Sequence, residues 1–572
     1  MSAPSASAEE SETAKAGGDR YGISNVEKGI AVAGFLVVLA LRCRYIYAAR
    51  FDTDESQHLH VVWGWATGLL PYRDFFDNHA PLFHILCAPL LRLFGERADI
   101  LLLMRWCMVP LWLGSLVLIY AIGAKAFSPR AGLWAALLSA TSARFFFKMG
   151  EFRTDVLWTF LWFSALAVFI QMRLSARQFF FAGLILGTGL AVSMKTSMML
   201  MDLAVSGIVL LLLGIFLRKR PLSVMLLARC LGAWIVGFVV LPAAVMGYFA
   251  HQGALDLMRK YIIDHNRLPG MSLLDRAGQY GLQIALVSCT AVAVAAACAK
   301  RSAAPSLGFR RAAVILFTAS FYILVRFIWP IVTAQDYAPL DPLFYICLGG
   351  LLVFGWRWLA GRAASLAPMV LAVFAAGNLA LIFWTENPLR TGTAPEIAMV
   401  ADVLKLTTPG QVIMDAKGET IFRRRAYFYV LETLTLKRFE LGLLQDDIVA
   451  CMTKARVPIV HGALRMPETA AAWERAHYVP IGPLDALGLR LPRFETGSIS
   501  FSIDIPERYA ILSDHGEVQG LLDGERVSGP RELSVGSHDF KPDALQPGER
   551  FAVLWARAAE KGYSPFPKRP VP

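Results

Sequence analysis

The sequence predicts a mainly α-helical membrane protein, a polytopic transmembrane bundle of about eleven helices followed by a C-terminal extracytoplasmic domain. Three observations predict it. Of the 572 residues, 56% are hydrophobic and only 17% are charged, a balance too apolar for one soluble core. Apolar segments of about 17–25 residues, the length that crosses a bilayer, recur between residues 29 and 385. From about Pro388 the chain becomes charged and alternates as strands do.

The apolar segments can be placed along the first two thirds of the chain. They are 29–48, 101–121, 131–147, 155–172, 180–195, 198–217, 230–249, 281–299, 312–330, 341–356 and 365–385. Basic residues cluster in every second connection, as cytosolic loops do. These residues are Lys125, Arg130, Arg173, Arg177, Arg218, Lys219, Arg220, Lys300, Arg301, Arg310, Arg311, Arg357 and Arg362. The pattern places the N-terminus inside the cell and everything after about residue 386 outside.

Four regions follow from this topology. Residues 1–28 lack an apolar core, so we expect a disordered cytosolic tail and not a cleaved signal peptide. Residues 29–387 form the transmembrane domain. Residues 388–495 are expected to be a soluble α/β subdomain, and residues 496–572 a β-rich terminal subdomain.

Local patterns support the two soluble subdomains. Residues 395–406 have a helical pattern, and 411–414 and 457–461 are strand-like. In the last region, alternate residues are apolar, and Asp523-Gly524 fits a hairpin turn. The alternating residues are Ile499, Phe501, Ile503 and Ile505.

The first outer connection contains two helices of its own. Leu59, Val62, Trp63, Ala66 and Leu70 are spaced as one face of a helix, and residues 81–94 are apolar but too short to span. We therefore expect outer-face helices within residues 56–94.

Composition also excludes some functions. The net charge of +12 could suggest a nucleic-acid partner, but the basic residues lie in short clusters between apolar segments and not on one face. The eight cysteines include no C-x-x-C pair, so we expect neither disulfides nor a cysteine-bound metal. No inverted pair of broken apolar segments, typical of transporters, is visible.

The strongest candidate for chemistry is the acidic cluster directly after the first span. Asp52, Asp54 and Glu55 begin an outer helix. One of them can cap the helix and complement its dipole. A second can serve as the general base that activates an acceptor hydroxyl. Both interpretations stay open at this point.

Two further clusters lie on the same side. Residues 148–155 contain Glu151, Arg153 and Asp155, although Asp155 can equally be a helix cap. Residues 71–82 contain Tyr72, Arg73, Asp74 and His79 before a helix that begins near Pro81. A single histidine such as His79 is more often structural than a ligand.

In this order, these motifs resemble those of the GT-C glycosyltransferases, and most closely the dolichyl-phosphate-mannose protein mannosyltransferases and the lipid A aminoarabinose transferase. The resemblance rests on four stretches within residues 29–385. They are Asp54-Glu55, Tyr72-Arg73-Asp74 with His79-Ala80-Pro81-Leu82, the loop from Glu151 to Asp155, and Gly189 to Lys195. The sequence departs from relatives at Asn78-His79-Ala80-Pro81 and at Gln335-Asp336-Tyr337.

The resemblance implies an inverting sugar transfer from a polyprenyl-phosphate donor, on the outer face of a bacterial inner membrane, to an envelope glycan, lipid or protein. It implies catalytic roles for Asp54 and Asp155, with Glu55 as a further candidate. No cofactor is certain, and a divalent metal stays open.

The leaving phosphate requires positive charge in a partly dry site. Lys195 and Arg326 stand out because they lie at the outer ends of apolar segments, where charge is costly. Snorkelling to lipid headgroups is the alternative interpretation of both. The candidate substrate-binding residues are Tyr72, Arg73, Asp74, His79, Arg153, Lys195, Arg259, Arg326 and Tyr337. The loop 261–270 is a lid or a linker. The rival function is a polytopic transporter or lipid flippase.

Overall fold

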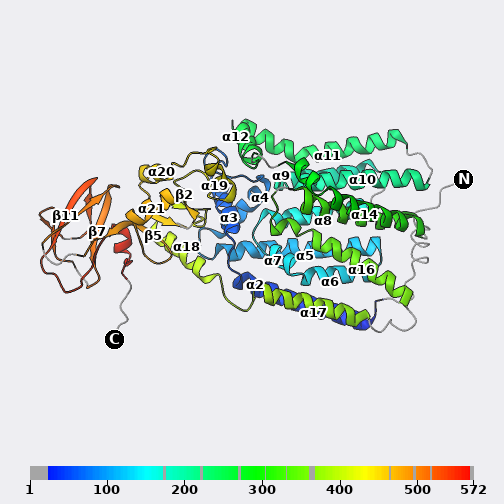
Figure 1. Cartoon of the computed structure of the whole chain (residues 1–572), viewed down its shortest axis with the longest axis horizontal. Helices are drawn as coiled ribbons and strands as arrows, with labels where there is room; N and C mark the ends of the chain where they lie inside the picture. Colours follow the sequence, from blue (N-terminus) through cyan, green and yellow to red (C-terminus); the bar gives the residue numbers. More distant parts are fainter. Residues whose placement is uncertain are drawn as a thin grey trace.

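A helical bundle and a strand-containing domain lie end to end along the long axis of the molecule (Figure 1). The computed structural model describes residues 23–171, 175–218, 223–267, 269, 272–302, 305–329, 331–359, 367–462, 465–493, 497–515, 518–527 and 529–566. Most of the predicted tail, residues 1–22, lies outside this set. Helix α2 begins at Asn25, where Ser24 and Glu27 form a capping box.

The predicted bundle is confirmed. Its helices are α2 (Asn25–Ala48), α5 (Ile100–Ala126), α6 (Pro129–Thr141), α7 (Ala143–Lys148), α8 (Thr154–Gln171), α9 (Ala176–Val192), α10 (Thr196–Arg218), α11 (Val224–His251), α14 (Gly281–Arg301), α15 (Pro305–Ile323), α16 (Leu340–Leu359) and α17 (Ala367–Thr385). Eight helices of the described chain are long and apolar enough to cross a membrane. The predicted number of eleven is approximate, since the third segment is broken at Ser142, whose backbone is extended.

Among the described residues, Arg130, Arg310 and Arg311, which were predicted to be cytosolic, lie at the end of the bundle where α2 begins. Arg173, Lys219, Arg220 and Arg362 lie outside the described residues. Arg130 pairs with the buried Glu27 at 2.7 Å. Arg311 donates to the carbonyl of Ala126 at 3.2 Å, and Arg310 donates to that of Ile170 at 3.1 Å. The C-terminal domain lies at the opposite end (Figure 1). The two ends of the bundle therefore differ in charge as the positive-inside rule requires.

Small residues bring helices of the bundle into close contact. Gly183 and Gly187 on α9 face the backbone of α11, where an added Cβ would overlap the carbonyl oxygens of Trp234 and Phe238. Gly237 on α11 is equally close to the Phe180 carbonyl. Such small-residue contacts are typical of helix pairs in lipid, where burial of apolar surface gives little driving force.

Two helices follow the first span, as predicted. They are α3 (Thr53–Ala66) and α4 (Leu82–Phe94). Nearly all of α3 from Glu55 to Gly64 is buried, because the C-terminal domain covers its outer side. His60, for example, bonds to the Ile421 carbonyl at 2.8 Å.

Part of the segment between α11 and α14 contacts the C-terminal domain. The segment contains α12 (Leu255–Arg259), the π-helical turn η1 (Lys260–Asp264) and α13 (Leu273–Gln279). Arg438 donates to the carbonyls of Asp264 and Arg267 at 2.6 and 2.9 Å. Asn266 donates to the carbonyl of Asn78 at 2.9 Å. The described part of the predicted lid or linker is thus held between the two domains.

The C-terminal domain is built on an eight-stranded sheet with path order β10-β7-β12-β5-β3-β1-β2, and β4 also pairs with β5. Its strands are β1 (Val412–Asp415), β2 (Arg424–Arg425), β3 (Ile459–His461), β4 (Tyr478–Pro480), β5 (Asp485–Arg490), β7 (Glu507–Ser513), β10 (Arg531–Leu533) and β12 (Phe551–Trp555). The accompanying helices are α18 (Ala394–Leu406), α19 (Thr433–Glu440), α20 (Ile448–Lys454), α21 (Glu468–His477) and α22 (Ala556–Glu560). Strand β1 pairs in parallel with β2 and β3, and the other pairs are antiparallel.

A second sheet has the order β6-β11-β8-β9. It consists of β6 (Ile499–Ile503), β8 (Gly520–Leu522), β9 (Glu525–Arg526) and β11 (Gly536–Pro542). Asp523 and Gly524, both at positive φ, form the predicted turn between β8 and β9. The larger sheet contains strands from both sides of residue 495, where we placed a subdomain boundary.

Candidate active site

Three neighbouring carboxylates at the start of α3 make different contacts. Asp52 is the N-cap, and its side chain accepts from the Asp54 backbone N–H at 2.9 Å. Glu55 completes the capping box by accepting from the Asp52 backbone at 3.1 Å. Capping therefore occupies Asp52 and Glu55, and it leaves the Asp54 carboxylate available for the site.

Glu55 is a fully buried group. Arg105 on α5 holds it through two contacts, at 2.7 and 2.5 Å. The Phe152 backbone N–H also donates to it at 2.8 Å. The two oxygens of Glu55 thus bind α5, the 149–153 loop and the α3 cap together. This geometry favours a structural role, since the Glu55 side chain is fully buried and a general base must reach its substrate, whereas the Asp54 side chain is 23% exposed.

Asp54 instead faces a series of alternating charges. Arg153 contacts both Asp54 and, at 3.4 Å, Asp155 at the start of α8. Lys195, between α9 and α10, contacts Asp155 at 2.6 Å and Asp336 at 2.7 Å. Asp336 belongs to the 3-10 turn η3 (Ala334–Tyr337). Acidic groups from separate connections of the bundle therefore meet at the end that faces the C-terminal domain.

A lysine of the C-terminal domain completes this series. Lys417, which follows β1, contacts Asp54 directly. We call the resulting set the charged row; it consists, in order, of Lys417, Asp54, Arg153, Asp155, Lys195 and Asp336. It contains three cations and three carboxylates.

The charges of the row shift the pKa values of Asp54 and Arg153. Burial by itself would raise the pKa of Asp54, but Arg153 and Lys417 outweigh burial and hold that pKa below its ordinary range. Burial would also lower the pKa of Arg153, but Asp54 and Asp155 raise it above its ordinary value. Asp54 is thus ionised at neutral pH, which a base requires.

Glu151 has a different environment from Asp54. Its side chain contacts Lys148 at 2.6 Å and Arg153 at 3.5 Å. Burial raises the pKa of Glu151 to about 7, although Arg153 and Lys148 oppose the shift. Glu151 can therefore change its protonation near neutral pH, directly beside the charged row.

His79 lies next to the row and is oriented by two neighbours. The buried Asp77 contacts His79 Nδ1 at 2.9 Å, and the Tyr72 hydroxyl donates to the His79 carbonyl at 2.6 Å. Burial would lower the pKa of His79, but Asp77, Glu432 and Asp54 raise it. His79 therefore adds positive charge as the pH falls, whereas burial lowers the pKa of its neighbour His84 to about 4.

The structure brings together only part of the predicted site. Asp54, Asp155, Arg153 and Lys195 form the row, with His79 beside it and Tyr72 supporting His79. Tyr337 adjoins Asp336, and its ring lies 4.8 Å from the Arg144 guanidinium carbon.

Four predicted residues lie elsewhere. Arg73 and Asp74 pair with each other at 2.9 Å, and Asp74 lines a separate cavity. Arg259 and Arg326 are exposed. In the described chain, neither of these arginines contacts the charged row.

Sequence reasoning missed Lys417 and Arg105. Arg105 carried a signal, because it is a charged residue inside an apolar segment. Lys417 carried none, because it lies in an ordinary charged stretch far from Asp54 in sequence.

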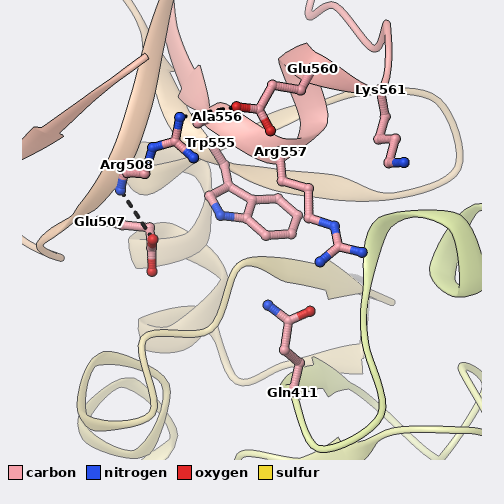
Figure 2. A pocket seen from close by; sticks show the side chains of 8 residues that line it. All are labelled: Gln411, Glu507, Arg508, Trp555, Ala556, Arg557, Glu560 and Lys561. Carbon is pink, nitrogen blue, oxygen red and sulfur yellow. Dashed lines mark hydrogen bonds and ion pairs between the residues drawn. The ribbon is translucent and has the colours of Figure 1, made fainter.

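Two cavities lie outside the row. One, of about 310 Å³, lies between α3 and the C-terminal domain and is lined by residues that include His60, Trp63, Arg424 and Tyr427. The other, of about 390 Å³, lies within the C-terminal domain. Figure 2 shows the Trp555 indole in this cavity, with the Arg508–Glu560 pair on one side and Gln411 and Arg557 on the other. Among the described residues, no three His, Cys, Asp or Glu side chains are arranged to hold a metal ion.

Comparison with solved structures identifies the fold. The chain resembles the crystal structure of ArnT from Cupriavidus metallidurans in the apo state, with a TM-score of 0.54, 12% identity, and coverage of 80% of this chain and 98% of that chain. The chain has the ArnT fold. ArnT bound to undecaprenyl phosphate gives a TM-score of 0.52 at 13% identity, with the same coverage. The expected GT-C-like fold is thereby confirmed.

Other comparisons give weaker or no similarity. The Archaeoglobus fulgidus oligosaccharyltransferase in the apo form has a TM-score of 0.46 at 13% identity, with coverage of 81% of this chain and 74% of that chain. No family model matches the sequence, and no curated protein matches it.

Proposed function

We propose that this protein is a membrane glycosyltransferase that takes a sugar from a polyprenyl-phosphate donor. The observation that carries the proposal is the charged row at the outer end of an ArnT fold. It places an ionised carboxylate, Asp54, among cations that can meet a phosphate. The ArnT structure with bound undecaprenyl phosphate supports this class of donor.

In the proposed reaction, Asp54 removes the proton of an acceptor hydroxyl as that oxygen attacks the anomeric carbon. The new glycosidic bond forms while the bond between the sugar and the phosphate breaks, and polyprenyl phosphate leaves. Arg153, Lys195 and His79 stabilise the charge that develops on this phosphate. Attack opposite the leaving group inverts the anomeric configuration.

The acceptor is proposed to enter from the side of the C-terminal domain. The 310 Å³ cavity lies behind α3, and its aromatic, arginine and aspartate side chains suit a polar ring-shaped ligand such as a sugar. We place this domain, and the reaction, on the outer face of a bacterial inner membrane, because the basic loops lie at the other end of the bundle.

The test is sugar transfer in membranes that contain the full chain and a polyprenyl-phosphate sugar donor. Mass analysis of envelope glycans, with and without the gene, identifies the sugar and the acceptor. Loss of one defined sugar, restored by the wild-type chain and not by Asp54→Asn, is the expected result. Unchanged glycans together with transport of the lipid across the membrane would instead support a flippase.

A further inference from the structure

The catalytic end of the bundle lacks balanced charge without the C-terminal domain. Within the row, the bundle supplies the carboxylates Asp54, Asp155 and Asp336 but only two cations, Arg153 and Lys195. Asp52 also approaches Arg153, at 3.5 Å, whereas Glu151, at the same distance from Arg153, is paired with Lys148 at 2.6 Å. An anionic phosphate is therefore poorly matched to the bundle alone. Lys417 is the third cation of the row and the one member that comes from outside the bundle.

The position of Lys417 is fixed by buried contacts. Asp415, at the end of β1, accepts from the Gly418 and Thr420 backbones at 2.7 and 3.0 Å and from Arg425 at 2.8 Å. Gly418 has φ +87° and lies so close to His60 of α3 that a side chain would be crowded. This turn therefore holds Lys417 over the start of α3 with little freedom, as binding residues need.

From this arrangement we infer that Lys417 is a ligand for the donor phosphate and that it exchanges its contact with Asp54 for one with the phosphate when the donor binds. The inference rests on the proposed function. A lysine suits this exchange because its ammonium group is a compact charge on a flexible chain. In the structure its side chain is largely buried, with 11% exposed, so the exchange takes place in a partly dry site.

The exchange couples donor binding to activation of the base. While Lys417 contacts Asp54, it competes with the acceptor proton for the carboxylate. Once Lys417 turns to the phosphate, Asp54 keeps Arg153 as its cationic partner and becomes more basic. The enzyme thus acquires its active base only when a donor is present. The C-terminal domain therefore takes part in binding the donor.

The first test measures binding of undecaprenyl phosphate to the purified full chain in nanodiscs, which requires no transfer reaction. Lys417→Met should weaken binding about tenfold or more, the usual effect of losing one charge-assisted contact. Lys417→Arg should retain most of the affinity. Lys405→Met is the matched control, because Lys405 lies in the same domain and packs on Tyr563, away from the row.

A second variant, Asp54→Asn, tests whether Lys417 exchanges partners or only supports the structure around Asp54. Asp54→Asn removes the resting partner of Lys417, so undecaprenyl phosphate should bind more tightly than to the wild type while transfer is lost. In Lys417→Met, the acid limb of the kcat/KM profile should move to higher pH, because Asp54 loses one of its two neighbouring cations. The other ionisable groups around Asp54 remain in place; they are Asp52, Glu55, His79, Glu151, Arg153 and Asp155.

The outcomes distinguish the inference from the proposed function. If the wild type does not bind undecaprenyl phosphate, the proposed donor is wrong. If the wild type binds it and Lys417→Met binds equally well, Lys417 is not a phosphate ligand and the inference is overturned. If Asp54→Asn binds the lipid more weakly than the wild type, Lys417 does not exchange between the two partners.

Discussion

Replacing Asp54 by asparagine tests the core of the proposed mechanism. Asparagine keeps the shape of the side chain but removes its basicity. The cap of α3 is unaffected, because Asp52 is the capping residue and Glu55 its partner. Folding should therefore survive, and the effect should appear in the rate of transfer.

The structure also gives the expected magnitudes. Loss of a positioned general base lowers the rate by roughly 10²–10⁴-fold. The cost in stability should be smaller, about 1–2 kcal/mol, because Asp54 is 23% exposed and Arg153 keeps Asp52, Glu151 and Asp155 as partners.

The assay is sugar transfer from a polyprenyl-phosphate donor in membranes, with expression and thermal unfolding measured on the same samples. Asp155→Asn is a useful comparison, since Asp155 contacts two cations of the row and should give an intermediate loss if it orients them. A well-folded Asp54→Asn variant with full activity would refute the assignment and point to Asp155 as the base.

Four other changes test separate parts of the structure. Glu55→Gln should lower the thermal midpoint of unfolding and change kcat little, because it breaks a buried ion pair, at a cost of about 3–5 kcal/mol, although Arg105 keeps its backbone carbonyl partners. A large loss of kcat with an unchanged midpoint would contradict this. Lys195→Ala should weaken donor binding on the order of tenfold, whereas Arg326→Ala, exposed and outside the row, should not. Glu151→Gln should flatten the pH dependence of unfolding. The raised pKa of Glu151 means that the folded state holds its proton more tightly than the unfolded state, so wild-type stability should fall as pH rises from about 4.5 to about 7. Reporter fusions after Arg130, Arg177 and Arg311 should be cytosolic and those after Pro388 exported; a cytosolic C-terminal domain would place the row on the wrong side.

Much of the fold could be predicted because its signals are local. A span is recognised from its own length and apolarity, and the Lys/Arg asymmetry is visible in each connection. The strand alternation from Ile499 and the Asp523-Gly524 turn are equally local. The path of the larger sheet was not predictable, because β5 pairs with β12, far along the chain, and such pairing leaves no mark in either segment.

The roles of single residues in the candidate site were also not predictable from the sequence alone. Asp54 and Glu55 are adjacent carboxylates, and no local pattern distinguishes a base from a structural anchor. On a helix, consecutive side chains point about 100° apart, so the two neighbouring acids meet different surroundings. Arg105 pairs with Glu55, and Lys417, 363 positions from Asp54 in the sequence, contacts Asp54. Arg105 and Lys417 both reach these acids through tertiary contacts. Each places one positive charge beside one of two otherwise similar acids. The proposed difference in role between Asp54 and Glu55 therefore arises only when α5 and the C-terminal domain have both packed against α3.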